Sequence, residues 1–386
     1  MTRVRLCLLV FCLAMFACSN RAPRMRAFDE LVFIDHQNLR YIADSARIAF
    51  QANEARKNMA QAARLGVDTY LFFAKETFDA MLNLDSPMPG IGSIGAQAFA
   101  PNGEHRRVGA YLRCALGELL QYARTKQLRV FYHSNQFIFK ENVLKVIKPA
   151  VWGTSICPGR QMTWSIYRQK LGEFFALFPD LAGLQITGDE TQASVLECRC
   201  DSCRHLGFVE RVNRLTTETA RVCAGYGKEV QMRTWGRMGE LTAESGPAHM
   251  GDGLPNHVFF SIKNTQGDFH LPNAMDEGFI RAADAKRIIV EFDAWREYEG
   301  HNYFPCYMGD IWAPRFKLLQ QLGIKRIAVR LNWNSNINPI FAAPWGNLVN
   351  IYTFLKLAEN PQRSPDDILR SFIRENYPQA CQEKAF

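Results

Sequence analysis

The stretch ADSARIAFQANEARKNMAQAARLGVDTYLFFA, residues 43–74, joins a helical pattern to a strand pattern. Apolar residues recur at helical spacing as far as Gly66, and a glycine at this position is typical of a helix end. The run TYLFFA, residues 69–74, has the length and the β-branched and aromatic composition of a buried strand. An equivalent apolar run, ELVFID, precedes the helical pattern at residues 30–35. This order predicts a strand, a helix and a second strand that is parallel to the first.

The same alternation continues along the chain. Further apolar runs are LRVFYHS (128–134), LAGLQIT (181–187), EVQMRTW (229–235), HVFFSIK (257–263), RIIVEFD (287–293) and IKRIAVRLN (324–332). Together with the first two they make eight, and nearly continuous apolar strands between amphipathic helices are typical of a parallel sheet covered by helices. We therefore predict an α/β fold, a (β/α)8 TIM barrel with a short C-terminal helical extension. The competing doubly wound open sheet lacks support, because no strand is followed by a glycine-rich phosphate loop.

The composition indicates a globular protein. The chain has 386 residues, of which 47% are hydrophobic and 22% charged, so one large domain is possible. The formal net charge of +8 comes partly from the first 26 residues, which hold five arginines and no acidic residue. The rest of the chain is nearly balanced, which argues against a nucleic-acid partner.

The N-terminus has the pattern of an export signal. MTRVR is basic, and LCLLVFCLAMF is an apolar run that is too short to span a bilayer. The following residues, Met15 to Ser19, resemble a bacterial lipobox in which Cys18 is lipidated. An ordinary cleaved signal is the alternative, and either one exports the protein. We therefore expect a signal peptide and lipobox at 1–18, a catalytic barrel at 27–360 and a helical extension at 361–386. We expect the protein in the periplasm or at the cell surface of a bacterium. It should contact the membrane only through the lipid on Cys18.

Polar side chains gather at the predicted strand ends. In a TIM barrel the carboxyl ends of the strands form the active-site face. A single acidic residue there is equally well a solvated charge or a helix cap, but the whole set favours a site: His133, Asp189, Glu190, Arg233, Trp235, Lys263, Asn264, Asp268, Asp293, Glu297, Asn332 and Trp333.

This set of residues suits glycoside hydrolysis. One carboxylic acid protonates the leaving oxygen, and a second carboxylate activates water or attacks carbon. Trp235, Trp333 and Trp345 offer flat apolar faces to sugar rings. Lys263 and Arg233 add cations, which suit an acidic substrate.

Several segments resemble the family 67 glycoside hydrolases, the α-glucuronidases of xylan breakdown. The resemblance rests on HVFFSIKNTQGDF, VEFDAWREYEG and PWGNLVNIYTFLKLAENPQRSPDDILRSFIRENY, and on LAGLQITGDE, which resembles that family's fourth barrel strand. It covers roughly residues 180 to 377. Ile186 departs from the pattern, because the family has a basic residue there.

The resemblance implies roles for five residues. Glu190 is the implied general acid, and Asp268 and Glu297 are the implied carboxylates that activate water in an inverting mechanism. Lys263 and Arg233 fall where that family holds the uronate of its substrate. Asp189, His133, Trp235 and Trp333 remain candidates for substrate binding.

Two other functions stay open. Gly188, Asp189 and Glu190 also resemble the Gly-Asp-Glu of β-N-acetylhexosaminidases, in which the Asp orients the acetamido group of the substrate and no separate base is needed. The third possibility is a surface lipoprotein without catalytic activity that binds glycans through the same tryptophans.

A group of cysteines follows the predicted fourth strand. Cys198, Cys200 and Cys203 have the spacing C-x-C-x-x-C. Disulfides to distant cysteines are one reading for an exported protein. The alternative is a structural zinc, for which a fourth ligand is needed, with His205, Cys157, Cys223 and Cys306 as candidates. We expect no catalytic metal or organic cofactor, and the sequence does not indicate an oligomeric state.

Overall fold

The computed structural model places most of the chain. It describes residues 26–36, 43–135, 139–153, 155–188, 194–234, 254–271, 273–275, 280, 285–299, 306–332 and 347–377. The signal and lipobox residues, the pair Asp189 and Glu190, and the tryptophans Trp235, Trp333 and Trp345 lie outside this part.

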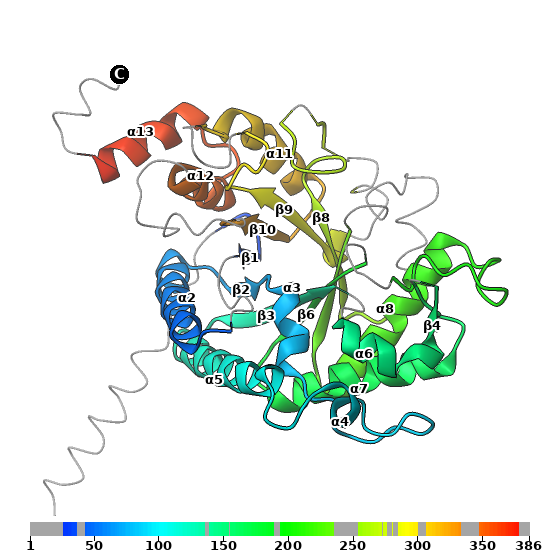
Figure 1. The fold of residues 1–386 in the computed structure, drawn as a ribbon. Coiled ribbons are helices and arrows are strands. Elements are labelled where there is room, and N and C mark those ends of the chain that lie inside the picture. Colours follow the sequence, from blue (N-terminus) through cyan, green and yellow to red (C-terminus); the bar gives the residue numbers. More distant parts are fainter. Residues whose placement is uncertain are drawn as a thin grey trace, which may run out of the picture.

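Eight parallel strands close into a barrel, which confirms the predicted fold class (Figure 1). The barrel order is β1, β2, β3, β6, β7, β8, β9, β10 and back to β1, so each strand pairs with the next one along the chain. Every pairing is parallel. The strands are β1 (Glu30–Asp35), β2 (Thr69–Phe72), β3 (Arg129–Asn135), β6 (Gly183–Thr187), β7 (Glu229–Arg233), β8 (Val258–Lys263), β9 (Ile288–Asp293) and β10 (Arg326–Arg330).

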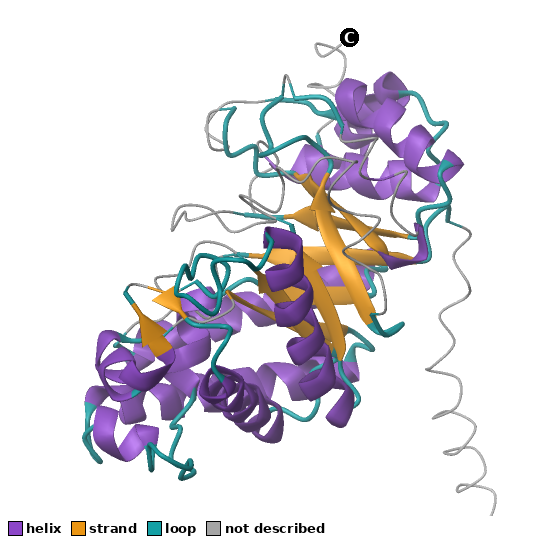
Figure 2. Ribbon diagram, turned by 90° about the vertical axis from the view of Figure 1, so that its right-hand side faces the viewer, coloured by secondary structure: helices purple, strands orange, loops and turns teal. Residues whose placement is uncertain are grey.

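Helices surround the barrel and connect its strands (Figure 2). The long ones are α2 (Ser45–Leu65), α5 (Glu104–Thr125), α7 (Gln161–Leu177), α8 (Phe208–Gly225), α11 (Gly309–Gln321) and α12 (Asn347–Glu359). Shorter helices are α3 (Lys75–Phe78), α4 (Ile94–Ala98) and α6 (Glu141–Val146), and 3₁₀ turns lie at Asp79–Met81, Lys148–Ala150 and Ala285–Arg287. A small hairpin, β4 (Val151–Trp152) with β5 (Ser155–Ile156), precedes α7.

Helix α2 shows how the local sequence sets the element ends. The Asp44 side chain accepts a hydrogen bond from the backbone N–H of Ala46 at 2.8 Å, which satisfies one of the unpaired donors of the first turn. Gly66 ends the helix with φ of 80°, in the left-handed region that glycine adopts without steric cost. The end at Gly66 is the one that the sequence pattern predicted.

Two apolar layers hold the barrel together. The larger one lies between strands and helices and includes Phe33, Tyr70, Val230 and Phe292. The smaller one fills the barrel interior with Val32, Ile34, Leu71, Phe73, Phe131, Phe259, Ile289 and Ala328. Successive residues of a strand point to opposite faces of the sheet. Beyond the smaller apolar layer, every second residue towards the carboxyl end of each strand therefore points into the barrel. Those positions are polar, and they form the site described below.

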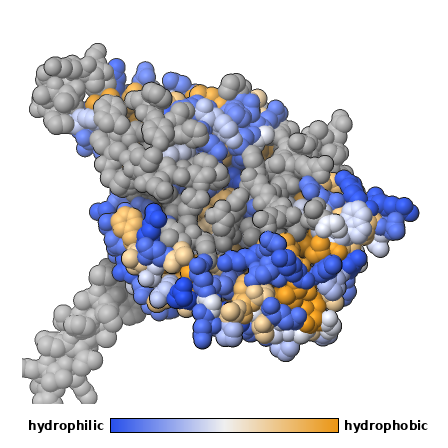
Figure 3. Space-filling model, in the orientation of Figure 1, coloured by the Kyte–Doolittle hydropathy of each residue, from blue (hydrophilic) through white to orange (hydrophobic). Residues whose placement is uncertain are grey.

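The described chain ends in the helix α13 (Pro365–Asn376), which packs beside α11 and α12 (Figure 1). No helix among the described residues is both long enough and apolar enough to cross a membrane. On the face shown in Figure 3 the described surface is mostly hydrophilic, and hydrophobic residues gather towards the lower right.

Candidate active site

The site is built from alternate residues of neighbouring strands. Gln185, Gln231, Ser261 and Glu291 lie on the inner face of β6, β7, β8 and β9, and Gln185 donates to Gln231 at 3.2 Å. Two residues further along the same strands come Thr187, Arg233, Lys263 and Asp293, and Arg330 lies beside Asp293 on β10. The sheet therefore brings a polar layer and then a charged layer to the carboxyl end of the barrel.

Arg233 is held by a buried carboxylate. Its Nε lies 3.0 Å and 2.9 Å from the two carboxylate oxygens of Glu291. Ser261 donates its hydroxyl to the same carboxylate, and the Arg233 guanidinium lies 5.1 Å from the centroid of the Phe73 ring. Both charged side chains are almost fully buried. The Arg233 charge is thus balanced inside the protein, and the guanidinium is fixed in place.

Arg330 joins two carboxylates from β9 and the loop that follows it. Its Nε and Nη2 bind Asp293 at 2.9 Å and 2.6 Å, and its Nη1 binds Glu297 Oε2 at 2.8 Å. Asp293 also accepts the backbone N–H groups of Trp295 and Glu297, each at 3.0 Å, so it caps this loop as well as pairing with Arg330. Burial lowers the pKa of Arg330, but the two carboxylates raise it more, so it stays charged.

Lys263 and Asp268 form a third pair. Lys263 Nζ donates to one oxygen of Asp268, and that oxygen also accepts the backbone N–H of Phe269 at 2.8 Å. The second oxygen of Asp268 accepts the hydroxyl of Tyr298. Lys263 Nζ lies 4.9 Å from the centroid of the Phe269 ring, and the Arg330 guanidinium lies 4.7 Å from the same centroid. The second and third pairs therefore share one aromatic ring.

The protonation of this pair follows from its surroundings. Burial and the charges of Arg233 and Arg330 lower the pKa of Lys263 to about 7, although Asp268 raises it. Burial alone would raise the pKa of Asp268, but Lys263, Tyr298 and the Phe269 amide together bring it below its ordinary value. Near neutral pH, Lys263 is thus partly protonated and Asp268 is ionised.

The remaining two described candidates are His133 on β3 and Asn332, which follows β10 and contacts the end of β1. His133 is buried, its Nε2 lies 2.7 Å from the Thr187 hydroxyl, and its ring stacks on Phe73 with centroids 3.5 Å apart. Asn332 accepts the His36 backbone N–H at 2.6 Å and donates to Asp35 at 3.0 Å. Phe73, which also lies near Arg233, thus links His133 to the charged layer.

The structure therefore gathers part of the predicted set. Lys263, Asp268 and Glu297 lie around Phe269 and Arg330 in one network. Arg233, which is paired with Glu291, lies close enough for its charge to lower the pKa of Lys263. Asp189, Glu190, Trp235 and Trp333 lie outside the described residues. Sequence reasoning missed Glu291, Arg330 and Tyr298. The first two occupy inward positions within strands, and strand alternation was the signal that would have found them.

The two predicted base carboxylates differ in how they are held. Both oxygens of Asp268 carry hydrogen bonds. Glu297 has one oxygen on Arg330, and among the described residues its other oxygen has no hydrogen-bond partner. Its side chain is 16% exposed. Glu297 is therefore the carboxylate with an oxygen available to a water molecule.

A cavity of about 720 Å³ lies at the opposite end of the barrel. Its lining includes Glu30, Arg129 and Arg326. Arg129 binds Glu30 at 3.0 Å and Glu229 at 2.6 Å, and Arg326 binds Glu30 at 3.2 Å. Ion pairs at the amino ends of barrel strands contribute to stability in this fold, so we do not assign the chemistry to this end.

Comparison with known proteins gives structural relatives only. No protein-family model and no curated protein sequence matches the chain. Among solved structures, it is similar to a β-N-acetylhexosaminidase from Bacteroides fragilis, with a TM-score of 0.55 and 14% identity over 93% of this chain and 72% of that one. An exo-β-N-acetylglucosaminidase from Vibrio harveyi, of family GH20, gives a TM-score of 0.50 and 10% identity over 92% of this chain and 58% of that one. A GH138 enzyme targeting pectin rhamnogalacturonan II gives a TM-score of 0.60 and 10% identity over 91% of this chain and 51% of that one.

These neighbours are glycoside hydrolases with the same barrel fold. Identities of 10% to 14% show a shared fold. This chain also spans little more than half the length of two of the three. The comparison thus agrees with the closed barrel.

Proposed function

We propose that this protein is a glycoside hydrolase that acts on glycans carrying acidic sugars, with its active site at the carboxyl end of the barrel. The observation that carries the proposal is the charged layer at the ends of β7 to β10, where three cations interleave with four carboxylates: Arg233, Lys263 and Arg330 with Glu291, Asp293, Asp268 and Glu297. Ionisable groups concentrated in this way at the active-site end of a barrel are more typical of a site than of a stabilising core.

The proposed mechanism uses two carboxyl groups. Glu190, which follows the last described residue of the β6 segment by two positions, protonates the glycosidic oxygen. Glu297 accepts a proton from water on the opposite face of the sugar, because it alone of the two candidate bases has an oxygen without a hydrogen bond from the described residues. Arg330 holds Glu297 in position, and Asp268 keeps its charge beside Lys263. The proton taken from water and the proton given to the leaving group balance over one inverting turnover.

The preference for acidic substrates rests on Lys263. A buried lysine with a pKa of about 7 gains its full charge when an anion binds beside it. A sugar carboxylate supplies that anion, and a neutral sugar does not. The charges of Arg233 and Arg330 contribute to this low pKa, so a ligand carboxylate beside Lys263 would add to the effect of Asp268, which raises it.

A second candidate is an enzyme of the β-N-acetylhexosaminidase type. It is favoured by the similarity to the Bacteroides fragilis and Vibrio harveyi structures and by the Asp189-Glu190 pair directly after the fourth barrel strand. In that mechanism Asp189 orients the acetamido group, Glu190 is the acid, and neither Asp268 nor Glu297 is needed as a base.

Single substitutions separate the two mechanisms. If Glu297 activates water, Glu297→Gln should lower kcat by about 10²–10⁴ on both activated and unactivated glycosides, since water attack is needed whatever leaves. Asp189→Asn should have a smaller effect. The control is Glu299→Gln two positions along the loop, because Glu299 accepts the Leu271 amide and, in the part of the chain that the structure describes, forms no ion pair. Loss of activity in Asp189→Asn with full activity in Glu297→Gln would instead establish the second candidate.

A further inference from the structure

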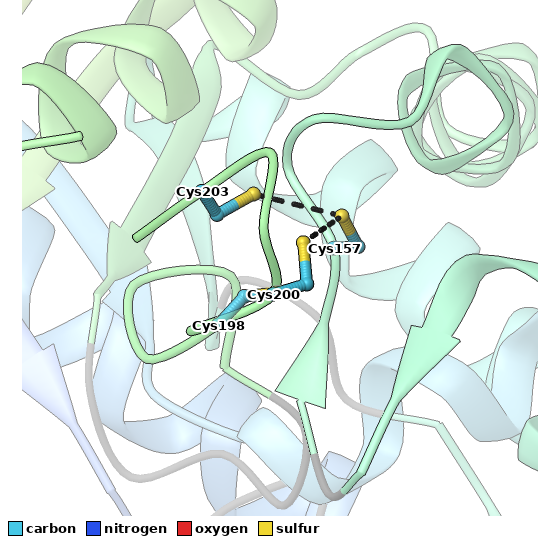
Figure 4. Close-up of side chains that lie close together, drawn as sticks. All are labelled: Cys157, Cys198, Cys200 and Cys203. Carbon is cyan, nitrogen blue, oxygen red and sulfur yellow. Dashed lines mark hydrogen bonds between the residues drawn. The ribbon is translucent and has the colours of Figure 1, made fainter. Parts of the chain in front are cut away.

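Four cysteines meet beside the loop that follows the predicted catalytic pair. Cys198, Cys200 and Cys203 lie on this loop, and Cys157 comes from the segment after β5 (Figure 4). Their four sulfur atoms lie within 4.8 Å of one another. Cys157, Cys198 and Cys203 are fully buried, and Cys200 is partly exposed. The other candidates for a fourth ligand are not in this group: His205 is exposed, Cys223 lies in the main apolar core, and Cys306 contacts Met308.

The sulfur separations match a shared metal better than disulfides. Cys157 Sγ lies 3.4 Å from Cys200 Sγ and 3.6 Å from Cys203 Sγ. A disulfide would bring two sulfurs to about 2.05 Å. A tetrahedral zinc with Zn–S bonds of about 2.3 Å sets its ligands about 3.8 Å apart. The Cys157 sulfur lies close to the ligand separation of a zinc site from two other sulfurs at once. This fits a metal centre with several ligands, whereas a disulfide joins only two sulfurs.

The backbone around the thiols supports the same geometry. The Cys203 N–H donates to the Cys200 carbonyl at 2.8 Å, which closes a tight turn. A Cβ at Gly159 would lie 3.2 Å from Cys203 Sγ, so the glycine gives the room that this close approach requires.

A buried arginine lies against the cluster. Arg211 on α8 is 1% exposed. Its guanidinium donates to the carbonyls of Leu196 at 3.0 Å, Cys198 at 2.5 Å and Leu206 at 3.1 Å, and also to that of Cys203. Among the described residues no carboxylate pairs with it. A buried charge normally has an opposite charge nearby. Four thiolates around one Zn²⁺ carry a net charge of −2, which would supply the missing negative charge.

We propose that Cys157, Cys198, Cys200 and Cys203 bind one structural zinc ion. Binding releases the thiol protons to solvent and involves no oxidation or reduction. With four protein ligands the site has no open position for water, so its role is structural and not catalytic. The ion would fasten the loop after Glu190 to the β5–α7 connection and, through Arg211, to the start of α8. This proposal does not depend on the glycosidase assignment.

The test is the metal content of the full chain, purified without added chelator. We expect about one zinc per chain in the wild type, measured by plasma mass spectrometry. Cys157→Ser should lose that zinc. Cys223→Ser, a buried cysteine outside the cluster, and Cys114→Ser, an exposed one, should both keep it. Full zinc in Cys157→Ser, or iron in place of zinc in the wild type, would overturn the proposal.

A second measurement on the wild type covers the case in which Cys157→Ser does not fold. After exchange into Co²⁺, a tetrahedral thiolate site gives intense visible d–d bands and a near-ultraviolet thiolate-to-metal band, and we expect both. Only the weak absorption of octahedral Co²⁺ would overturn the proposal. Alkylation of the denatured, unreduced protein then separates the two readings of the cysteines. All four should react if zinc held them, whereas unreactive pairs would show disulfides.

Discussion

Binding of an acidic sugar at pH 8 should draw a proton onto Lys263. With its pKa at about 7, this side chain is only about one-tenth protonated at pH 8. A ligand carboxylate in contact with an ammonium group shifts a pKa by about 1–3 units towards the charged form. The expected uptake is therefore roughly 0.4 to 0.9 proton per ligand at pH 8. At pH 6 the side chain is already about nine-tenths protonated, and the uptake should fall to roughly one-tenth.

Calorimetry can measure this uptake. Glucuronic acid is titrated into the full chain at pH 8 in two buffers of different ionisation enthalpy, and the difference in heat gives the number of protons bound. N-acetylglucosamine is the neutral ligand, and Lys263→Met is the variant without the titrating group. Lys145→Met removes an exposed lysine on α6 and serves as the matched control. Equal proton uptake in Lys263→Met and the wild type, or binding of glucuronic acid with no uptake at pH 8, would show that Lys263 is not the group that takes up the proton.

Three further outcomes are expected. Arg330→Met leaves Asp293 and Glu297 without their buried cation, so the free energy of unfolding should fall by about 3–5 kcal/mol in urea titrations. A loss below about 1 kcal/mol would show that the ion pairs of Arg330 are not important for stability. The depressed pKa of Lys263 means that the unfolded chain binds more protons than the folded chain between about pH 7 and pH 10.5, so stability should rise with pH through that window, and Lys263→Met should flatten the rise. Cys18→Ser should abolish lipidation and move the protein out of the membrane fraction; unchanged membrane association would contradict the lipobox.

The fold followed from hydrophobic pattern because each strand carries it locally. Eight apolar runs, separated by helical patterns, lie within a few residues of the eight observed barrel strands. Burial on both faces requires such runs in a parallel barrel. The hairpin of β4 and β5 was not predicted, because two-residue strands leave no periodic signal.

The site was harder to predict, because its geometry depends on which residues face inward. Asp268 and Glu297 were identified from their places after strands, but their cation partners decide how each can act. Arg330 and Glu291 lie within apolar runs, where a lone charge gives no indication of its partner. The fourth cysteine of the cluster, Cys157, could likewise not be identified from the sequence alone. Cys157 lies more than forty positions from Cys200 in sequence, and only the fold brings the two together.

Hydrolysis of acidic glycans by the full chain is the decisive measurement for the proposed glycosidase activity. Oligosaccharides ending in a uronic acid, the corresponding aryl uronides and neutral analogues are incubated with the wild type and with Glu190→Gln, and the first product anomer is followed by NMR. We expect turnover of the acidic substrates with inversion. In Glu190→Gln the rate on the oligosaccharide should fall by about 10²–10⁴, and the rate on the activated aryl uronide should fall less. Glycan binding without hydrolysis of any substrate would contradict the proposed activity, as would equal rates for the wild type and Glu190→Gln.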